Sequence, residues 1–149
     1  MKPKIKVTAA SLQKTISELR KFGNEAEIAI DQTTDLAAKQ IATEAKMNVN
    51  AYGKKIVDFV GEITSQQEGE MYYTISADNV PLAAYAEFGT GAYIEVADEW
   101  RNLAWQFYKN GMGTMTPHPY LYPAFRQGRE EYQKTLNRIL EALTKKYST

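Results

Sequence analysis

The sequence predicts an α+β fold with N-terminal helices, a small antiparallel sheet and a long C-terminal amphipathic helix. Apolar residues recur at helical spacing over residues 8–50, alternate with polar residues over residues 54–76, and return to helical spacing from residue 120. The helices are grouped toward the ends of the chain and do not alternate with the strands. This grouping is typical of α+β domains and not of parallel βαβ proteins.

The chain is expected to form one domain over residues 1–149. Its 149 residues and 44% hydrophobic content are sufficient for a single core. We divide it into a flexible basic arm, helices, a part made mainly of strands and a turn, an inserted helix, a mobile loop and a terminal helix. These segments are predicted at residues 1–7, 8–50, 54–96, 98–110, 111–119 and 120–146, respectively.

The composition excludes several functional classes. Eighteen Lys and Arg residues balance eighteen Asp and Glu residues, so the chain lacks the positive charge that supports nonspecific binding of nucleic acid. The absence of cysteine excludes disulfides, thiolate nucleophiles and cysteine-bound metals. No apolar run reaches the roughly 18 residues of a membrane span, and no signal peptide is recognisable. We therefore expect a cytosolic protein without a cofactor, a membrane partner or a sequence-specific nucleic-acid partner.

Two helices are predicted in the amino-terminal part. Residues 8–22 carry leucine and isoleucine at helical spacing, and Gly23-Asn24 has the residue types that end helices. A second helix is predicted over residues 25–50, with an alanine-rich face that allows close packing. The segment "AYG", residues 51–53, is expected to end it.

The middle of the chain is predicted to form strands. Two alternating stretches, residues 54–63 and 70–76, are expected to pair as a hairpin. The polar segment "TSQQEG", residues 64–69, would connect them, with Gly69 available for a positive φ angle. A third strand is predicted at residues 92–96.

Helical signals return before and after this third strand. Asp78 and Asn79 before Pro81 indicate a helix start, and the resulting turn is expected to stop at Gly89. Asp98 is expected to cap the inserted helix, which has an apolar face formed by Trp100, Leu103, Ala104 and Phe107.

The terminal helix is the clearest element. It follows residues 111–119, which lack periodicity, contain two glycines and are therefore predicted to form a loop. From Leu121 onward, apolar side chains mark one helix face, and the opposite face is charged. The apolar positions are Phe125, Tyr132, Leu136, Ile139, Leu140 and Leu143.

The stretch "YAEFGTG", residues 85–91, raises the question of an active site. A carboxylate pair would need Glu87 and a second acidic residue, for which the nearby residues are Glu95, Asp98 and Glu99. The two glycines match neither GxGxxG nor the Walker phosphate loop. The single His118 lies between two prolines without a second ligand motif, so we expect an exposed loop histidine and no metal site.

A structural interpretation explains the same stretch without a substrate. Tyr85 and Phe88 lie three residues apart and are expected to bury together on one face of a helical turn that ends at Gly89. Glu87 is expected to face elsewhere, free to pair with a basic group. Two alternatives remain at this point: the turn completes only its own core, or it also contacts a neighbouring subunit.

Together with "PHPYLYPAF" at residues 117–125, directly before the terminal helix, this stretch resembles the gene-product-ten family of tailed-phage neck proteins. The family, also called tail-completion or head-tail joining proteins, carries the motifs Y-A-x-(x)-E-F-G-T and P-x-P-F-L-x-P-A. The first is matched by Tyr85, Ala86, Glu87, Phe88, Gly89 and Thr90. The second is matched by Pro117, Pro119, Tyr120, Leu121, Pro123 and Ala124, with Tyr120 in place of the usual phenylalanine.

Two features depart from the family pattern. The spacing between Ala86 and Glu87 is one or two residues shorter than in many relatives, and the helix at 98–110 fills a segment that varies in the family.

The resemblance implies a non-enzymatic structural protein at the junction between portal and tail tube, in a phage particle or a prophage. Such proteins are monomeric in the host cytoplasm and become a ring, commonly a hexamer, in the neck of the virion. The implied partners are other copies of the chain, a head-side connector or adaptor, and a tail-terminator or tail-tube protein. A neutral surface would let DNA pass through the ring without adhering.

The amino-terminal arm is a candidate assembly segment. Lys2, Lys4, Ile5 and Lys6 form a stretch that is too polar to pack alone but able to extend the sheet of a neighbour. An ordinary disordered terminus is the alternative.

Three other functions compete with the neck interpretation. The first is a tail-terminator protein that caps the tail tube. The second is a small hydrolase that uses Glu87 and another carboxylate. The third is a generic interaction module with a groove lined by Trp100, Trp105 and Tyr108.

Overall fold

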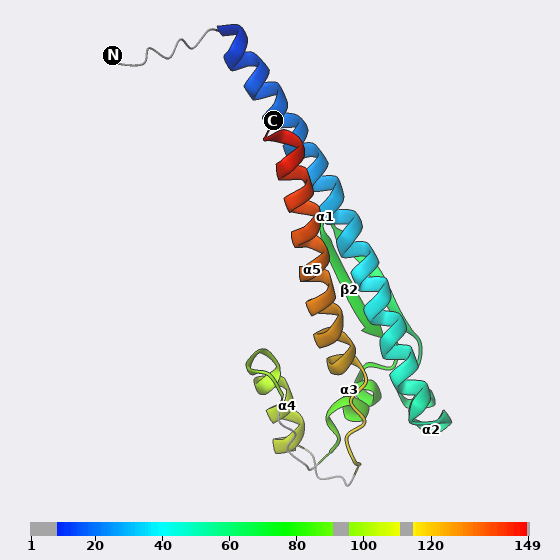
Figure 1. Ribbon diagram of the computed structural model, residues 1–149. Helices are drawn as coiled ribbons and strands as arrows, with labels where there is room; N and C mark the ends of the chain where they lie inside the picture. The colour runs from blue at the N-terminus through cyan, green and yellow to red at the C-terminus, as the bar shows by residue number, and fades with distance from the viewer. Residues whose placement is uncertain (1–8, 91–95, 111–114, 149) are drawn as a thin grey trace.

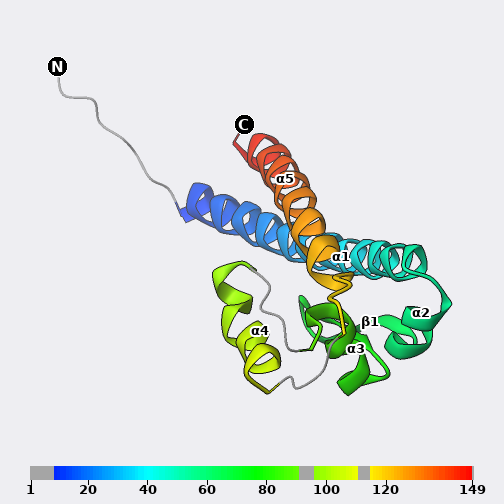
Figure 2. The same ribbon diagram turned by 90° about the horizontal axis from the view of Figure 1, so that it is seen from below.

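The computed structural model describes residues 9–90, 96–110 and 115–148, except for the side chains of residues 106–110. The elements are α1 (Ala9–Ala51), α2 (Lys54–Val60), β1 (Ile63–Gly69), β2 (Tyr72–Ala77), α3 (Val80–Phe88), α4 (Asp98–Asn110) and α5 (Leu121–Tyr147). The fold is α+β as predicted, with a two-stranded antiparallel sheet and a long C-terminal helix. The long helices α1 and α5 lie side by side, and α1 projects beyond the end of α5 (Figure 1). Figure 2 shows α2, α3 and α4 on one side of α1.

The prediction of two amino-terminal helices was wrong, because α1 is continuous through Gly23 and Asn24. Gly23 does not adopt a positive φ angle, and a Cβ atom added there would meet nothing within 4 Å. The side chains of Phe22 and Glu25 contact Tyr147 of α5. These tertiary contacts stabilise the helix on both sides of two residues that locally favour its end.

The prediction of a strand at residues 54–63 was also wrong, since most of this segment is helix α2. Ile56 and Val60, four residues apart, are its buried side chains, which is helical spacing. Gly53 and Gly61 flank the helix at φ angles of 94° and 74°. Glycine adopts such angles readily. The prediction that "AYG" ends the preceding helix is confirmed, because α1 ends at Ala51.

Strand β1 occupies the segment that was predicted to be the hairpin connection. Its register with β2 runs from Ile63 opposite Ala77 toward the tip, with a shift before Gly69. Met71, and not Gly69, has the positive φ angle, at 54°. The tip is held on α1 because the backbone N–H of Met71 donates to Asp31 Oδ1 over 3.0 Å. This long-range bond explains why the turn lies later than local residue types indicate.

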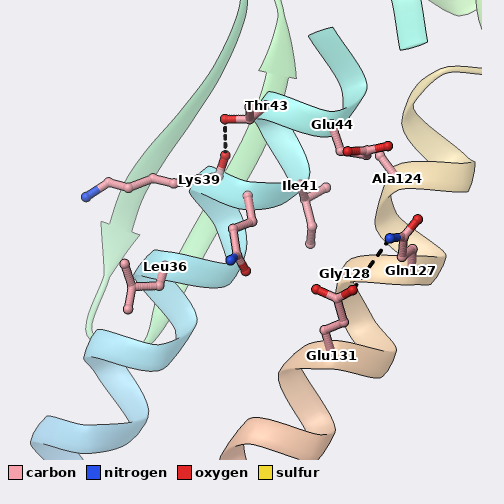
Figure 3. A pocket seen from close by; sticks show the side chains of 10 residues that line it. Leu36, Lys39, Ile41, Thr43, Glu44, Ala124, Gln127, Gly128 and Glu131 are labelled. Carbon is pink, nitrogen blue, oxygen red and sulfur yellow. Dashed lines mark hydrogen bonds between the residues drawn. The ribbon is translucent and has the colours of Figure 1, made fainter. Parts of the chain in front are cut away.

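The hydrophobic core lies where α1 meets the other elements. Its buried residues are Ile41, Ala42, Ala45, Val49, Ile56, Val60, Ile63, Ala83, Ala86, Tyr120 and Ala124. The alanine-rich face of α1 packs closely, as predicted. At the crossing of α1 and α5, a Cβ atom on Gly128 would lie 2.2 Å from Ile41 Cγ1. Figure 3 shows Ile41 directed toward α5 at this point.

The remaining predictions concern the second half of the chain. Helix α3 has Pro81 in its first turn and ends at Gly89, as predicted. Helix α4 begins at Asp98, as predicted, and α5 begins at Leu121, one residue after the predicted start. The strand predicted at 92–96 falls outside the described residues except for Val96, which is in neither a helix nor a strand. In the part of the chain that the structure describes, no helix is long and apolar enough to cross a membrane.

Candidate functional site

The two sequence motifs meet at the amino-terminal end of α5, and Glu87 joins them. Glu87 Oε2 accepts hydrogen bonds from the backbone N–H groups of Tyr120 and Leu121, at 2.8 and 2.9 Å. Its Oε1 accepts one from the N–H of Tyr122 at 2.9 Å. The first N–H groups of a helix have no partner within the helix. A residue of α3 therefore caps α5.

Burial and hydrogen bonding have opposite effects on the pKa of Glu87. Glu87 is only 3% exposed, and this burial raises the pKa of its carboxyl group. The hydrogen bonds from the three N–H groups lower the pKa, but by less than burial raises it. The positive end of the helix dipole also favours the ionised carboxylate. Burial, followed by the negative charge of Glu87, raises the pKa of the Tyr120 phenol. The expectation that Glu87 faces away, free for a basic group, was wrong.

Backbone hydrogen bonds extend the contact over residues 115–120, which we call the strap. The N–H of His118 donates to the carbonyl of Ala86 over 2.7 Å. The N–H of Thr90 donates to the Met115 carbonyl, and the N–H of Met115 donates to Thr90 Oγ1, each over 3.0 Å. The strap is thus tied to the end of α3 at both of its ends.

Two features of this junction require glycine at position 89: its backbone conformation and the lack of space for a Cβ atom. Its φ angle of 69° and ψ angle of −173° suit glycine alone. A Cβ atom would also lie 2.7 Å from the Met115 carbonyl oxygen and 2.8 Å from the ring of Pro117. The glycine of the first motif therefore allows the second motif to approach.

The carboxyl-terminal end of α1 holds the strap from its other side. Tyr52 donates its hydroxyl hydrogen to the Pro119 carbonyl over 3.1 Å, and Asn48 Nδ2 donates to the Tyr120 carbonyl over 3.0 Å. The hydroxyl of Tyr120 reaches the Ala83 carbonyl at 3.4 Å. This last bond gives the buried phenol of Tyr120 an acceptor.

The other motif residues differ in their burial. Phe88, Ala86 and Ala124 are buried, whereas Leu121, Pro117, Pro119 and Pro123 are half-buried. Tyr85 is 38% exposed, so the expectation that it buries together with Phe88 was wrong. The arm residues Lys2, Lys4, Ile5 and Lys6 lie outside the described residues.

An aromatic cluster attaches α4 to both motifs. The ring of Trp100 lies 6.3 Å from that of Phe88, 5.4 Å from Tyr122 and 6.1 Å from Phe125. Trp105 is 50% exposed on another face of α4. The groove predicted along Trp100, Trp105 and Tyr108 stays a prediction, because the side chain of Tyr108 lies outside the described part. The apolar spacing of α4 was the signal that could have placed Trp100 in this cluster.

The candidate partners for a catalytic carboxylate pair are engaged elsewhere. Asp98 pairs with Arg101, and Glu99 pairs with Arg129 over 3.0 Å, both on the surface. Glu95 lies outside the described residues. Among the residues that the structure describes, no group of three His, Cys, Asp or Glu side chains is arranged to hold a metal ion.

His118 is half-buried, so the expectation of an exposed loop histidine was wrong. Its ring meets that of Tyr52 edge to face, with centroids 4.9 Å apart. Its Nδ1 atom is buried without a hydrogen-bond partner in the structure. The packing of this ring against Tyr52, directly after α1, accounts for part of the burial.

Grooves flank the contact between α1 and α5, and two of them lie at its middle. The first, about 360 Å³, is lined mainly by polar residues, among which Gln127 donates to Glu131 (Figure 3). The second, about 320 Å³, is more apolar and includes Tyr73 and Ile75 of β2 with Phe125 and Tyr132 of α5. Glu87 and the strap line neither groove.

Comparison with known proteins does not add a family assignment. The junction is consequently interpreted from its own geometry and from the two sequence motifs. No family model, curated protein sequence or solved structure matches this chain.

Proposed function

We propose that the chain is a structural virion protein in the neck of a tailed phage or prophage. It completes the tail and joins a head-side connector to the tail-tube or tail-terminator protein, as a ring that is a hexamer in the virion. The observation that carries this proposal is the Glu87 cap, which joins the two family-like motifs in one structural unit. Motifs that define a fold are expected to pack together in this way.

The cap also supports a non-enzymatic role. Both carboxylate oxygens of Glu87 already accept backbone hydrogen bonds, and the residue is 3% exposed. A general acid or base must reach the substrate within hydrogen-bond distance. Both oxygens that a catalytic carboxylate would use are engaged in capping α5. Capping therefore accounts for a glutamate at position 87 without a catalytic role.

The projecting part of α1 supports assembly with other chains. Residues 9–21 are all exposed, and the amino-terminal part of α1 extends beyond the end of α5 (Figure 1). It presents Leu12, Ile16 and Leu19 on one face, at exposed fractions of 53%, 41% and 64%. Isolated helices shorter than about 12–15 residues are marginal in water. A neighbouring chain that covers this face would stabilise the segment.

The proposal is tested by electron microscopy of negatively stained phage particles produced with and without the chain. We expect filled heads and tails of normal length to accumulate separately when the chain is absent. Normally joined particles would overturn the proposal. Tails of uncontrolled length would instead indicate a tail terminator, because an uncapped tube continues to grow.

Matched variants connect this phenotype to the projecting helix. We expect Leu19→Ser to fold like the unmodified chain by circular dichroism but to restore fewer joined particles. Leu36→Ser is the control, because Leu36 is similarly exposed on α1, at 61%, but lies outside the projecting segment. Equal restoration by both variants would contradict a role for the projecting face in assembly.

A further inference from the structure

The outer edge of the small sheet is open in the described structure. Strand β2 faces α5, because Tyr73 and Ile75 line the groove that Phe125 and Tyr132 border. Strand β1 is therefore the outer strand. Apart from its ladder with β2, Ile63–Gly69 has no backbone hydrogen bond to another element within the described ranges. One row of its N–H and C=O groups is available for pairing.

Most of this edge, from Ile63 to Gln67, lacks the residues that protect edge strands against pairing. The strand sequence "ITSQQEG" contains no lysine, arginine or proline, and its one charged residue, Glu68, and its register shift both lie at the hairpin tip. A sheet of only two strands also gains stability from a third. The edge is thus suited to accept a strand from another source.

The amino-terminal arm has the matching sequence pattern. In "KIKVT", residues 4–8, apolar and polar side chains alternate, which in a strand places Ile5 and Val7 on one face and Lys4 and Lys6 on the other. Such a segment can pair through its backbone while it presents different chemistry to each side.

The two faces of β1 complement this alternation. Ile63 is buried, and Gln67, on the same face, reaches Asp31 of α1. The opposite face carries Glu68, whose carboxylate accepts a bond from Thr74 at the exposed surface. An added strand would place its apolar residues toward the body of the protein and its lysines beside Glu68. Opposite charges on neighbouring strands stabilise pairing.

The arm cannot reach this edge within its own chain. The hairpin tip is fixed to Asp31, which is 22 residues beyond Ala9, or about 33 Å at the rise of an α-helix. Residues 4–8, which directly precede Ala9, span at most about 18 Å when fully extended. The pairing therefore requires a second copy.

We propose that residues 4–8 of one copy add as a third strand to the outer edge of β1 in a neighbouring copy. This inference rests on the self-assembly required by the proposed function, and it names the two surfaces involved. The donor and acceptor surfaces differ, so the contact is heterologous. Repeated contacts of this kind close into a ring when the rotation between copies permits.

Disulfide trapping tests the contact directly, because the chain contains no cysteine of its own. Lys6→Cys is mixed with a differently tagged chain that carries Thr64→Cys, Gln66→Cys or Glu68→Cys. These three positions lie on the face of β1 opposite Ile63 and Gln67. Each would lie beside Lys6 in a different register between the arm and β1. A disulfide forms only when the two Cα atoms approach within about 7 Å. We expect a heterodimer whose yield peaks at one of the three positions.

Matched controls separate this contact from random collision. Thr43→Cys is exposed on α1 and is expected to give only background cross-linking with Lys6→Cys. Changing Lys4 to Glu in the arm-cysteine chain should reduce the yield severalfold. Glu68→Lys, added to the acceptor chain that carries Thr64→Cys or Gln66→Cys, should restore much of it. A yield equal to that of the Thr43 control at every β1 position would overturn the inference.

The outcome is distinguishable from failure of the proposed function. Oligomers detected by light scattering without trapping at β1 would overturn the arm contact and leave the neck proposal intact. Specific trapping together with normally joined particles in the absence of the chain would support the arm contact and overturn the neck proposal.

Discussion

The carboxylate of Glu87 accepts a hydrogen bond from the backbone N–H of Tyr120, 33 residues further along the chain, over 2.8 Å. This bond links the end of α3 to the beginning of α5. Because α5 also packs along α1, this bond fixes the position of α3 relative to both long helices. The following predictions test this junction and the contact between the two long helices.

We expect Glu87→Gln to lower the free energy of unfolding by about 1–3 kcal/mol, the usual cost of leaving buried polar groups unsatisfied. An amide has one oxygen, so its NH₂ group would face a backbone donor at the start of α5. Urea denaturation of both proteins measures the difference. Glu130→Gln, on the exposed surface of α5, is the control. Equal stability of the Glu87 variant and this control would refute the capping role.

Gly89→Ala should be more destabilising than Gly53→Ala. Both glycines have positive φ angles that cost about 1–3 kcal/mol for other residues. A Cβ atom at Gly53 meets nothing within 4 Å, whereas one at Gly89 would displace Met115 and Pro117. Thermal unfolding of the two variants measures the excess. Similar losses in both would show that the strap moves aside without cost.

Gly128→Ala is expected to destabilise the contact between α1 and α5 by about 1–3 kcal/mol, as overpacked cores do. The added Cβ would overlap Ile41, so Ile41→Ala should offset part of the loss in a double variant. Gly23→Ala is the matched control, because its site within α1 is open. It should raise stability by up to about 1 kcal/mol. Additive effects at Gly128 and Ile41 would contradict direct packing.

Acid should loosen the carboxyl-terminal end of α5 from α1. Hydrogen bonds from Lys146 and then Tyr147 lower the pKa of Glu25. A carboxyl group with a lower pKa in the folded chain binds fewer protons there than in the unfolded chain. Its stabilising contribution is therefore complete above about pH 4.3 and decreases as pH falls through the folded pKa.

Nuclear magnetic resonance of the ring contact between Phe22 and Tyr147 measures this loosening. The contact should weaken as the pH is lowered from neutral to about pH 3, below the ordinary pKa of glutamate. In Glu25→Gln it should be weaker at neutral pH and nearly independent of pH over that interval. An undiminished contact at low pH in the unmodified chain would rule out the Glu25 interaction as its cause.

Local sequence patterns succeeded where a segment's structure depends on residues close to it. The apolar stripe of α5 extends over 27 residues, so its period is unambiguous. Gly89 ended α3 as predicted because its backbone conformation is a local requirement. By contrast, residues 54–60 form a short apolar run in which alternation and helical spacing are both present. The segment forms a helix, in which Ile56 and Val60 are buried together.

Residue types alone were sufficient to predict the α+β class, the terminal helix and the two motifs at residues 85–90 and 117–124. The folded chain was needed to show that α1 continues through Gly23, that Met71 forms the hairpin turn, and that Glu87 caps α5. Each of these depends on partners distant along the chain: Tyr147 for α1, Asp31 for the hairpin and Tyr120 for Glu87. Residue types specify what a position can bond, but only the folded chain brings its partner within bonding distance.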